Sequence, residues 1–382
     1  MFSPYKMVKV GQVNVAFVGA VLEDTPTVVT PSGIAGLEFR DEAASINAVM
    51  PEIMAQKPDA VIALIHQGGT AQAKYDELDC STLQGPVVDV VRALDKNVSA
   101  VMTGHTHQGY SCRVDGRVVV QGEAQGHLLQ RLDLTIDLDR RAVTAVEGRN
   151  VFVDPAGPKD ARMTEIVARA DELTKPVASR VVATLGAEQI TRKANAAGES
   201  ALGDVIADSQ LAATRAPEFG GAVIAFMNPG GIRADLPGTP NPAMTVTYGE
   251  VFTVQPFGNL LTVMTLTGAQ IKTLLEQQLF EDTASGPRRI LQVSEGFAYT
   301  WDQSRPTGDK VVKMSLNGQP IDPAAAYRVT VNSFLADGGD NFTVLREGKD
   351  RLGGALDIDA FQNYLKAAPV KPGPQNRITR LN

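Results

Sequence analysis

Three of the four histidines lie directly after apolar runs that predict buried strands. His66 ends the run IALIH and precedes Gln-Gly-Gly, while His105 and His107 lie in VMTGHTHQG. Ligands of open α/β sheets bind at the carboxyl ends of strands, and neutral imidazole is a common ligand of divalent metals. Gly104 allows close backbone approach, so the His-x-His spacing can present two imidazoles to one centre. We therefore expect His66, His105 and His107 to bind metal, and His127 to be structural.

A second group of candidate residues follows a later apolar run. The segment NPGGIR contains Asn228, Gly230, Gly231 and Arg233. Two glycines after a strand can leave backbone N–H groups facing a ligand, and a guanidinium offers a planar charged fork to phosphate. An asparagine amide can donate and accept at a base edge. Alone, the same pattern also fits a tight turn followed by a surface arginine.

Two further segments, VQPFGN and NSFLADGGD, each carry one phenylalanine beside glycine and a polar group. Only 5% of the residues are aromatic, so Phe257 and Phe334 are unusual in such loops. Two rings about 7 Å apart can hold a flat heterocycle between them, and stacking contributes about 1–3 kcal/mol per base. Asp340 can accept two ribose hydroxyls. We expect a base to stack on both rings; for either ring alone, core packing is the alternative.

Hydrophobic periodicity predicts the elements that position these residues. Strands are expected at 13–21, 59–65, 98–103, 117–121, 128–138, 222–227, 311–316 and 327–331, and helices at 41–56, 87–94, 158–178, 199–215 and 268–279. Because strands alternate with helices, the fold class is α/β, with α+β character.

The length of 382 residues predicts two domains, since one core seldom exceeds about 250–300 residues. We expect a first domain over 1–150, a linker over 151–179 and a second domain over 180–382. The linker carries a polar helix that we expect to stop at Pro176.

Composition excludes some classes of protein. A net charge of -7 argues against a general nucleic-acid binder, which usually carries a basic face. The sequence contains no run of about 20 apolar residues, so we expect no membrane span, and the first residues lack the features of a signal peptide. The two cysteines, Cys80 and Cys112, leave two alternatives open: buried thiols or a single disulfide.

The run IALIHQGG, followed by TGHTH at 103–107, resembles the C-terminal part of the calcineurin-like metallophosphatase domain. More closely, it resembles the 5'-nucleotidase / UDP-sugar hydrolase family. The resemblance implies that His66 and His105 hold one divalent ion and that His107 holds its neighbour. The ions would be Zn, Mn or Co, two in intact members of the family.

One departure from the family is plain in the sequence. The D-x-H and G-N-H-[DE] motifs, which supply the remaining metal ligands and a catalytic histidine, do not occur in it. The resemblance implies that roughly the first third of a typical member is missing from this N-terminally truncated sequence. We therefore assign no catalytic residue and expect this chain to release little or no phosphate.

The later motifs resemble the 5'-nucleotidase C-terminal domain across nearly all of 180–370. They are GESALGDVIADSQ, NPGGIRADL, TYGEVFTVQPFGN and NSFLADGGDNF. The resemblance implies roles in binding substrate: base stacking by Phe257 and Phe334, ribose binding by Asp340, phosphate contacts by Arg233 and Arg192, a base or backbone contact by Asn228, and pocket lining by Asn259, Gly230 and Gly231.

The expected function is therefore hydrolysis of phosphate esters of nucleotides or nucleotide sugars, with metal ions activating a water. Two alternatives remain. One is a different reaction on this scaffold, such as cyclic-nucleotide phosphodiesterase or sulfur-ester hydrolase activity; the other is nucleotide binding without catalysis. The resemblance also implies a periplasmic or secreted location. The sequence specifies no oligomeric state.

Overall fold

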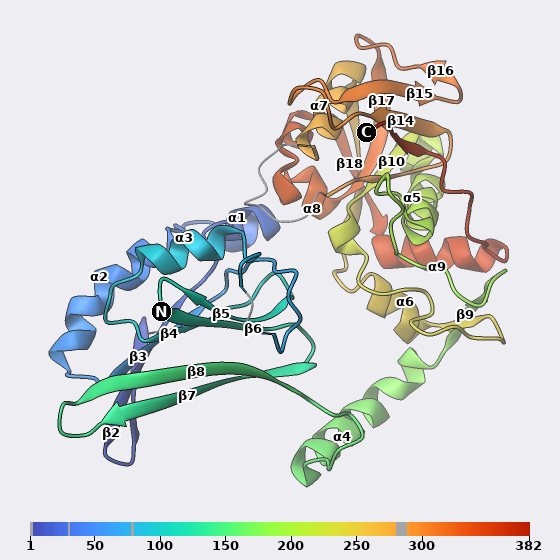
Figure 1. The fold of residues 1–382 in the computed structure, drawn as a ribbon. Helices are drawn as coiled ribbons and strands as arrows, with labels where there is room; N and C mark the ends of the chain where they lie inside the picture. The colour runs from blue at the N-terminus through green and yellow to red at the C-terminus, as the bar shows by residue number, and fades with distance from the viewer. Residues whose placement is uncertain (1–2, 30, 78–79, 280–288) are drawn as a thin grey trace. The chain divides into compact units, whose positions relative to one another are not determined.

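The computed structural model describes residues 3–29, 31–77, 80–279 and 289–382. The described chain separates into two compact units, the first mainly within residues 3–159 and the second mainly within 160–382 (Figure 1). Each unit combines sheets with helices, so the predicted α/β class is confirmed. The predicted domain boundaries at 150 and 179 stay a prediction.

A six-stranded sheet forms the centre of the first unit. Its order is β1-β2-β3-β4-β6-β5, with β2, β3, β4 and β6 parallel and the two outer strands antiparallel to their neighbours. Because the inner strands run in one direction, their carboxyl ends meet along one edge. The strands are β1 Tyr5–Val10, β2 Val13–Ala20, β3 Ala60–Ile65, β4 Ala100–Met102, β5 Gly109–Val114 and β6 Arg117–Gly122.

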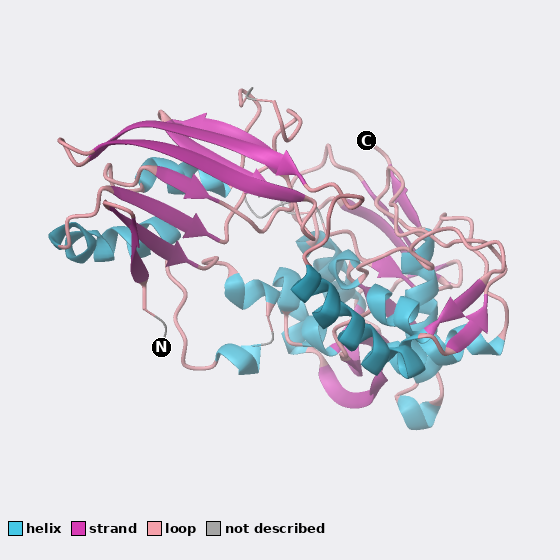
Figure 2. Ribbon diagram, turned by 90° about the horizontal axis from the view of Figure 1, so that it is seen from below, coloured by secondary structure: helices cyan, strands magenta, loops and turns pink. Residues whose placement is uncertain are grey.

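Different elements cover the two faces of this sheet. Helices α2 (Glu42–Ala55) and α3 (Pro86–Ala93) pack on one face, and the ribbon β7 (Leu128–Asp137) and β8 (Ala142–Phe152) packs on the other (Figures 1 and 2). Side chains of a strand alternate between faces. In β4, accordingly, Val101 joins the helix-side core while Ala100 and Met102 join the ribbon-side core.

Cys80 and Cys112 form a disulfide in the first unit, which resolves the alternative that the sequence left open. The bridge joins the loop after β3 to β5 and closes a segment that contains α3, β4 and the His105–His107 loop.

A five-stranded sheet of order β13-β10-β17-β12-β18 forms the centre of the second unit. Only β10 and β17 are parallel neighbours; the other pairs are antiparallel. The strands are β10 Ile224–Met227, β12 Leu260–Thr267, β13 Gln292–Val293, β17 Ala326–Asn332 and β18 Lys349–Leu356.

The second unit also has a core on each side of its sheet. Ile224 and Phe226 of β10 join a core with helix α7 (Gly268–Gln277) and the smaller sheet β16-β15-β14-β19. Met227 joins a core with the helices α5 (Ala201–Thr214), α6 (Tyr248–Val254) and α9 (Asp357–Ala367). The remaining elements here are α4 Ala161–Ala178, α8 Ser333–Ala336, β9 Val181–Thr184, β11 Thr245–Thr247, β14 Phe297–Trp301, β15 Val311–Leu316, β16 Gln319–Pro320 and β19 Ile378–Arg380.

The C-terminal end of helix α4 differs from the prediction. The helix was expected to stop at Pro176 but runs through that residue to Ala178. Proline removes one backbone donor from a helix, yet the final turn is closed by Ser179, whose N–H and hydroxyl both donate to the Lys175 carbonyl. No residue of α4 is buried.

A buried acidic cluster ties the C-terminal strand to α5. Glu199 accepts hydrogen bonds from the backbone N–H groups of Arg377 (2.9 Å) and Ile378 (3.2 Å), and Arg377 pairs with Asp208. Asp204 is 2% exposed, and neither of its carboxylate oxygens accepts a hydrogen bond from another described residue. Burial, opposed by Arg377 and reinforced by Glu199, raises the pKa of Asp204 to about 8.

Within the described ranges, none of the helices is both long enough and apolar enough to cross a membrane.

Reducing the disulfide is expected to destabilise the first unit by about 3–4 kcal/mol, because the bridge restricts a loop with a sequence separation of 32 in the unfolded chain. Urea unfolding followed with and without a reductant measures the difference. A Cys80→Ser/Cys112→Ser double variant should already show the lower stability and should not respond to reductant. An unchanged unfolding midpoint in reductant would contradict the prediction.

Candidate functional site

The three candidate metal ligands lie on two loops at the carboxyl ends of β3 and β4. The rings of His66 and His105 lie edge to face with their centroids 5.3 Å apart. Both His105 and His107 have left-handed backbone conformations, with φ of 71° and 54°. The structure therefore brings His66 and His105 together, with His107 two residues further along the same loop.

Direct packing of the two loops fixes these histidines. A Cβ atom on Gly68 would lie 2.3 Å from the Gly104 carbonyl oxygen and 2.5 Å from the Thr106 hydroxyl, so only glycine allows this approach. The Thr106 hydroxyl donates to the Gly69 carbonyl (2.7 Å), and Gln121 donates to that hydroxyl (2.8 Å). Thr106, between the two histidines, is thus an anchor of the loop.

A cavity of about 530 Å³ adjoins His66. Most of its lining is apolar, and it is formed by Ala20, Leu64, Ile65, His66, Met102, Thr103, Gly104, Leu128, Leu129 and Gln130. His127 is not part of this lining, and its ring nitrogen Nδ1 pairs with Glu123.

The described residues contain one compact group of candidate ligand atoms, and it lies among acidic side chains. Among the residues that the structure describes, the one group of at least three acidic, histidine or cysteine ligand atoms within 4.8 Å of one another is Glu23, Asp41 and Glu42. That group contains no histidine. The pair His66 and His105 can share one ion, but the described residues do not form a complete two-ion site of the kind that bridging carboxylates build.

Asp340 is the centre of the candidate site in the second unit. Asn228, which is 3% exposed and follows β10, donates through Nδ2 to Asp340 Oδ2 at 2.8 Å. Asn228 Oδ1 accepts from Asn332 Nδ2 at 2.9 Å, and Asn332 caps α8. Arg289 pairs with the other oxygen, Oδ1, at 3.3 Å. The side-chain amide of Asn228 therefore fixes Asp340.

The backbone and the charge of Asp340 are both unusual. Its φ of 55° is left-handed, a conformation that is uncommon for non-glycine residues and that aspartate adopts more readily than most. Burial raises the pKa of Asp340, while the Arg289 charge and the Asn228 hydrogen bond oppose that rise.

Arg233 and Phe257 form an exposed cation–π pair beside this centre. The guanidinium carbon lies 5.9 Å from the ring centroid, and Arg233 Nη1 donates to the Gly230 carbonyl at 3.1 Å. Phe257 is 58% exposed, so the ring and the charge together offer a surface to a ligand.

Phe334 has a different environment. Its ring is partly buried against the core, and a Cβ atom on Gly339 would lie 2.5–2.6 Å from three ring carbons. The ring is therefore held by the backbone that leads into Asp340. Core packing, the alternative to stacking, thus accounts for part of the Phe334 environment. Stacking of a base on Phe257 and Phe334 stays a prediction.

Part of the prediction for the glycines of the 228–233 loop, that their N–H groups face a ligand, is wrong. The Gly231 N–H, expected to face a ligand, donates to the Asn228 carbonyl within the turn at 3.1 Å. A Cβ atom there would lie 2.4 Å from Met227 Cε, so close packing explains this glycine. At Gly230 the nearest atoms to a Cβ would be Asn228 Nδ2 (3.6 Å) and Asp340 Oδ2 (3.8 Å), which leaves Gly230 beside the candidate site.

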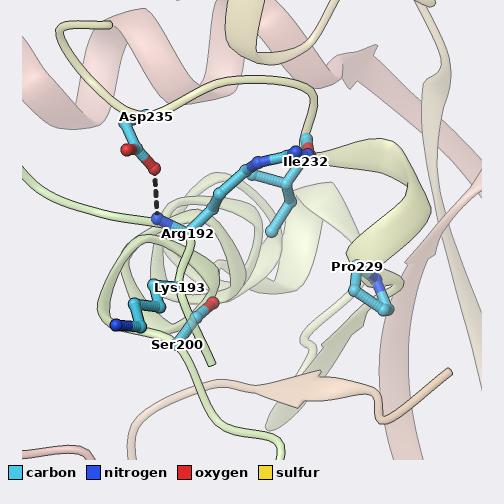
Figure 3. Close-up of a pocket in the computed structure, with 6 residues that line it drawn as sticks. All are labelled: Arg192, Lys193, Ser200, Pro229, Ile232 and Asp235. Carbon is cyan, nitrogen blue, oxygen red and sulfur yellow. Dashed lines mark hydrogen bonds between the residues drawn. The ribbon is translucent and has the colours of Figure 1, made fainter. Parts of the chain in front are cut away.

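Arg192 lines a pocket of about 380 Å³ in the same unit (Figure 3). Its Nη1 donates to the Ile232 carbonyl at 2.7 Å, and its backbone N–H donates to Asp235 at 2.8 Å. The other lining residues are Lys193, Ser200, Pro229, Ile232 and Asp235. The 228–233 loop thus contributes to this pocket and also to the Asp340 contacts.

Asn259 lies where the 254–259 loop meets α9. Its carbonyl accepts from the Asp357 N–H at 2.8 Å, and its Nδ2 donates to the Asp357 carboxylate at 3.2 Å. In the structure Asn259 joins the loop to the first turn of the helix. Its role as a pocket residue stays a prediction.

The sequence interpretation missed several residues of this site. Asn332 and Gly339 lie within the NSFLADGGD motif, so their motif position could have indicated them. Lys193 belongs to no pattern of hydrophobicity or spacing, but it directly follows the candidate Arg192. Arg289 also belongs to no such pattern, and no neighbouring motif indicated that it would contact the site.

Comparison with known proteins identifies the class. Residues 176–347 match the family described as 5'-nucleotidase, C-terminal domain. The crystal structure of a 5'-nucleotidase precursor from Thermus thermophilus is 30% identical, with a TM-score of 0.82 over all of this chain and 75% of that one. The chain belongs to the 5'-nucleotidase family, as the sequence motifs predicted.

Curated relatives extend well beyond this chain. Endonuclease YhcR of Bacillus subtilis is 28% identical over 98% of this chain but 29% of its own length, and cell wall protein Lmo0130 of Listeria monocytogenes is 29% identical over 96% and 48%. The chain therefore spans less than half of the length of either relative. Snake venom 5'-nucleotidase of Naja atra, 26% identical, is covered over 73% of its length.

Replacing Gly339 with alanine is expected to destabilise the second unit by about 1–3 kcal/mol, because the new Cβ atom would overlap the Phe334 ring. Gly238→Ala is a matched control, since no atom lies within 4 Å of a Cβ at that position. Thermal unfolding of both variants measures the effect. Equal melting temperatures for the two variants would show that the ring is not held against Gly339.

Proposed function

We propose that the chain is the nucleotide-binding and partial metal-binding portion of a hydrolase that cleaves phosphate esters of nucleotides or nucleotide sugars. The observation that carries this proposal is Asp340, a half-buried carboxylate fixed by Asn228 and Arg289 near the exposed pair Arg233 and Phe257. The carboxylate suits the ribose hydroxyls of a nucleotide, the guanidinium suits its phosphate, and the aromatic face suits its base.

Each part of the ligand has a proposed contact. The carboxylate of Asp340 accepts hydrogen bonds from the ribose hydroxyls, and Phe257 and Phe334 stack the base. Arg233 binds phosphate, since its guanidinium is exposed and always charged. Arg192 is a second phosphate contact, supported by its place on a pocket that the 228–233 loop also lines.

The first unit is proposed to bind divalent ions. His66 and His105 fit one shared ion because their rings are 5.3 Å apart on rigidly packed loops, and Gly104 leaves the space beside His66 Nδ1 open. His107 is proposed to bind a neighbouring ion. Bound Zn, Mn or Co would supply Lewis-acid activation of a water and of the phosphate. The histidines would hold the ions at the carboxyl ends of β3 and β4.

The disulfide supports a location outside the reducing cytosol, because such bridges persist in oxidising compartments. We propose a periplasmic or secreted protein. Relatives named as a cell wall protein and as a snake venom enzyme are in keeping with this.

Nucleotide binding without hydrolysis is a second candidate function. It is favoured by one observation: the contacts among Asp340, Asn228 and Arg289 and the Arg233–Phe257 pair all lie within the second unit and use no residue of the histidine loops. The two functions share the same binding residues and differ only in whether phosphate is released.

Calorimetric titration with AMP tests the binding site. Phe257→Ala and Phe334→Ala are each expected to weaken AMP binding about 5- to 150-fold, the equivalent of one lost stacking contact. Phe219→Ala is the control, because Phe219 is equally exposed at 58% but belongs to none of the motif loops. If all three variants bind AMP like the unsubstituted chain, the base does not stack on these rings.

Titration with Mn, Co or Zn tests the ion site separately. His66→Ala is expected to weaken binding at least about tenfold by removing one of two imidazole ligands, whereas His127→Ala should leave it unchanged. With ions and AMP present, phosphate release should stay below about 1 s⁻¹. Faster turnover would contradict the expectation of weak hydrolysis, and equal ion affinities in both variants would contradict the ligand assignment.

A further inference from the structure

Arg289 lies against the candidate site without belonging to any of its sequence motifs. Its Nη1 atom is 3.3 Å from Asp340 Oδ1, and the two side chains are 26% and 11% exposed. The opposite oxygen, Oδ2, takes the Asn228 amide at 2.8 Å. One charged and one neutral donor thus hold the carboxylate from its two ends.

The other cations near this segment are engaged elsewhere. Arg346 donates to the Asp337 carbonyl at 2.9 Å, and Arg351 pairs with the Asp337 carboxylate at 3.6 Å. Arg233 donates to the Gly230 carbonyl. Among the charged side chains that the structure describes here, Arg289 is therefore the one in an ion pair with Asp340.

We infer that Arg289 is a positioning residue that determines specificity: it keeps Asp340 an ionised, acceptor-only carboxylate, so that the site selects a sugar with a vicinal diol over its deoxy analogue. This inference rests on the proposed function, in which Asp340 binds the ribose.

Hydrogen-bond chemistry gives the reason. An ionised carboxylate has about four acceptor positions, so after bonding Asn228 and Arg289 it can still accept a hydroxyl on each oxygen. A protonated carboxyl carries a donor on one oxygen and no longer matches two donating hydroxyls equally. Hydrogen bonds to a charged acceptor are also roughly twice as strong as neutral ones.

The surroundings of Asp340 make the cation necessary. Burial raises the pKa of this carboxyl, and the Arg289 charge is the largest influence that opposes the rise. Without that charge the pKa of Asp340 rises further. The carboxyl then takes up a proton at a higher pH, and the stronger binding of the diol is lost as the pH falls through that range.

The experiment compares the affinities for adenosine and 2',3'-dideoxyadenosine between pH 5.5 and 8.5. The variants are Arg289→Gln, which removes the charge, and Arg289→Lys, which keeps it; Asp340→Asn removes the carboxylate itself. The unsubstituted chain should prefer adenosine by about tenfold to a hundredfold, the effect of lost hydrogen bonds to a charged group. Melting temperatures verify that each variant is folded.

Arg289→Gln should lose most of the preference for adenosine, and should lose more of it at pH 5.5 than at pH 8.5. Its affinity for dideoxyadenosine should change by less than about twofold, since that ligand lacks the diol. Arg289→Lys should recover most of the preference, and Asp340→Asn should show none at any pH.

Equal weakening of both ligands in Arg289→Gln, or an unchanged preference with an unchanged pH profile, would overturn the role of Arg289 while leaving the proposed function intact. Failure of the unsubstituted chain to bind either nucleoside would instead overturn the proposed function, and this inference with it.

Discussion

The candidate site depends on one constraint: a carboxylate that is removed from water and stays ionised needs hydrogen-bond donors or a neighbouring positive charge. Asn228 and Arg289 meet this need for Asp340, whose backbone is left-handed. Close packing also explains why glycine is needed beside Asp340, because a side chain at Gly339 would displace the Phe334 ring. The Phe334 ring and the Asp340 acceptor therefore belong to one closely packed segment of the chain.

The direction of the strands explains why these residues meet. β10 and β17 are parallel neighbours, so their carboxyl ends lie side by side, and the Asn228–Asn332 hydrogen bond joins those ends. The first unit uses the same arrangement, since β3 and β4 are parallel neighbours whose ends carry His66 and His105. In both units, polar loops extend from the edge of a sheet whose core is apolar on each face, which is the usual position of ligand sites in α/β folds.

Elements with a continuous apolar run or a long helical period could be predicted from the sequence, as β3, β10 and α5 were, because burial determines both the pattern and the structure. The motif loops could be predicted too. An element without a pattern of buried positions could not: β8 is mostly exposed and exists through its hairpin pairing with β7. Arg289 lies in no periodic segment, and its contact with Asp340, far along the chain, exists only after folding. Whether Cys80 and Cys112 are free thiols or a disulfide could likewise be decided only from the folded structure.

A crystal structure of the chain grown with adenosine tests the central claim most directly. The proposed binding mode predicts the two ribose hydroxyls within hydrogen-bond distance of the Asp340 carboxylate, with Asn228 and Arg289 still bound to it and the base on the Phe257 ring. Adenosine bound elsewhere, or an Asp340 carboxylate contacted only by Asn228 and Arg289 in the presence of saturating ligand, would contradict it.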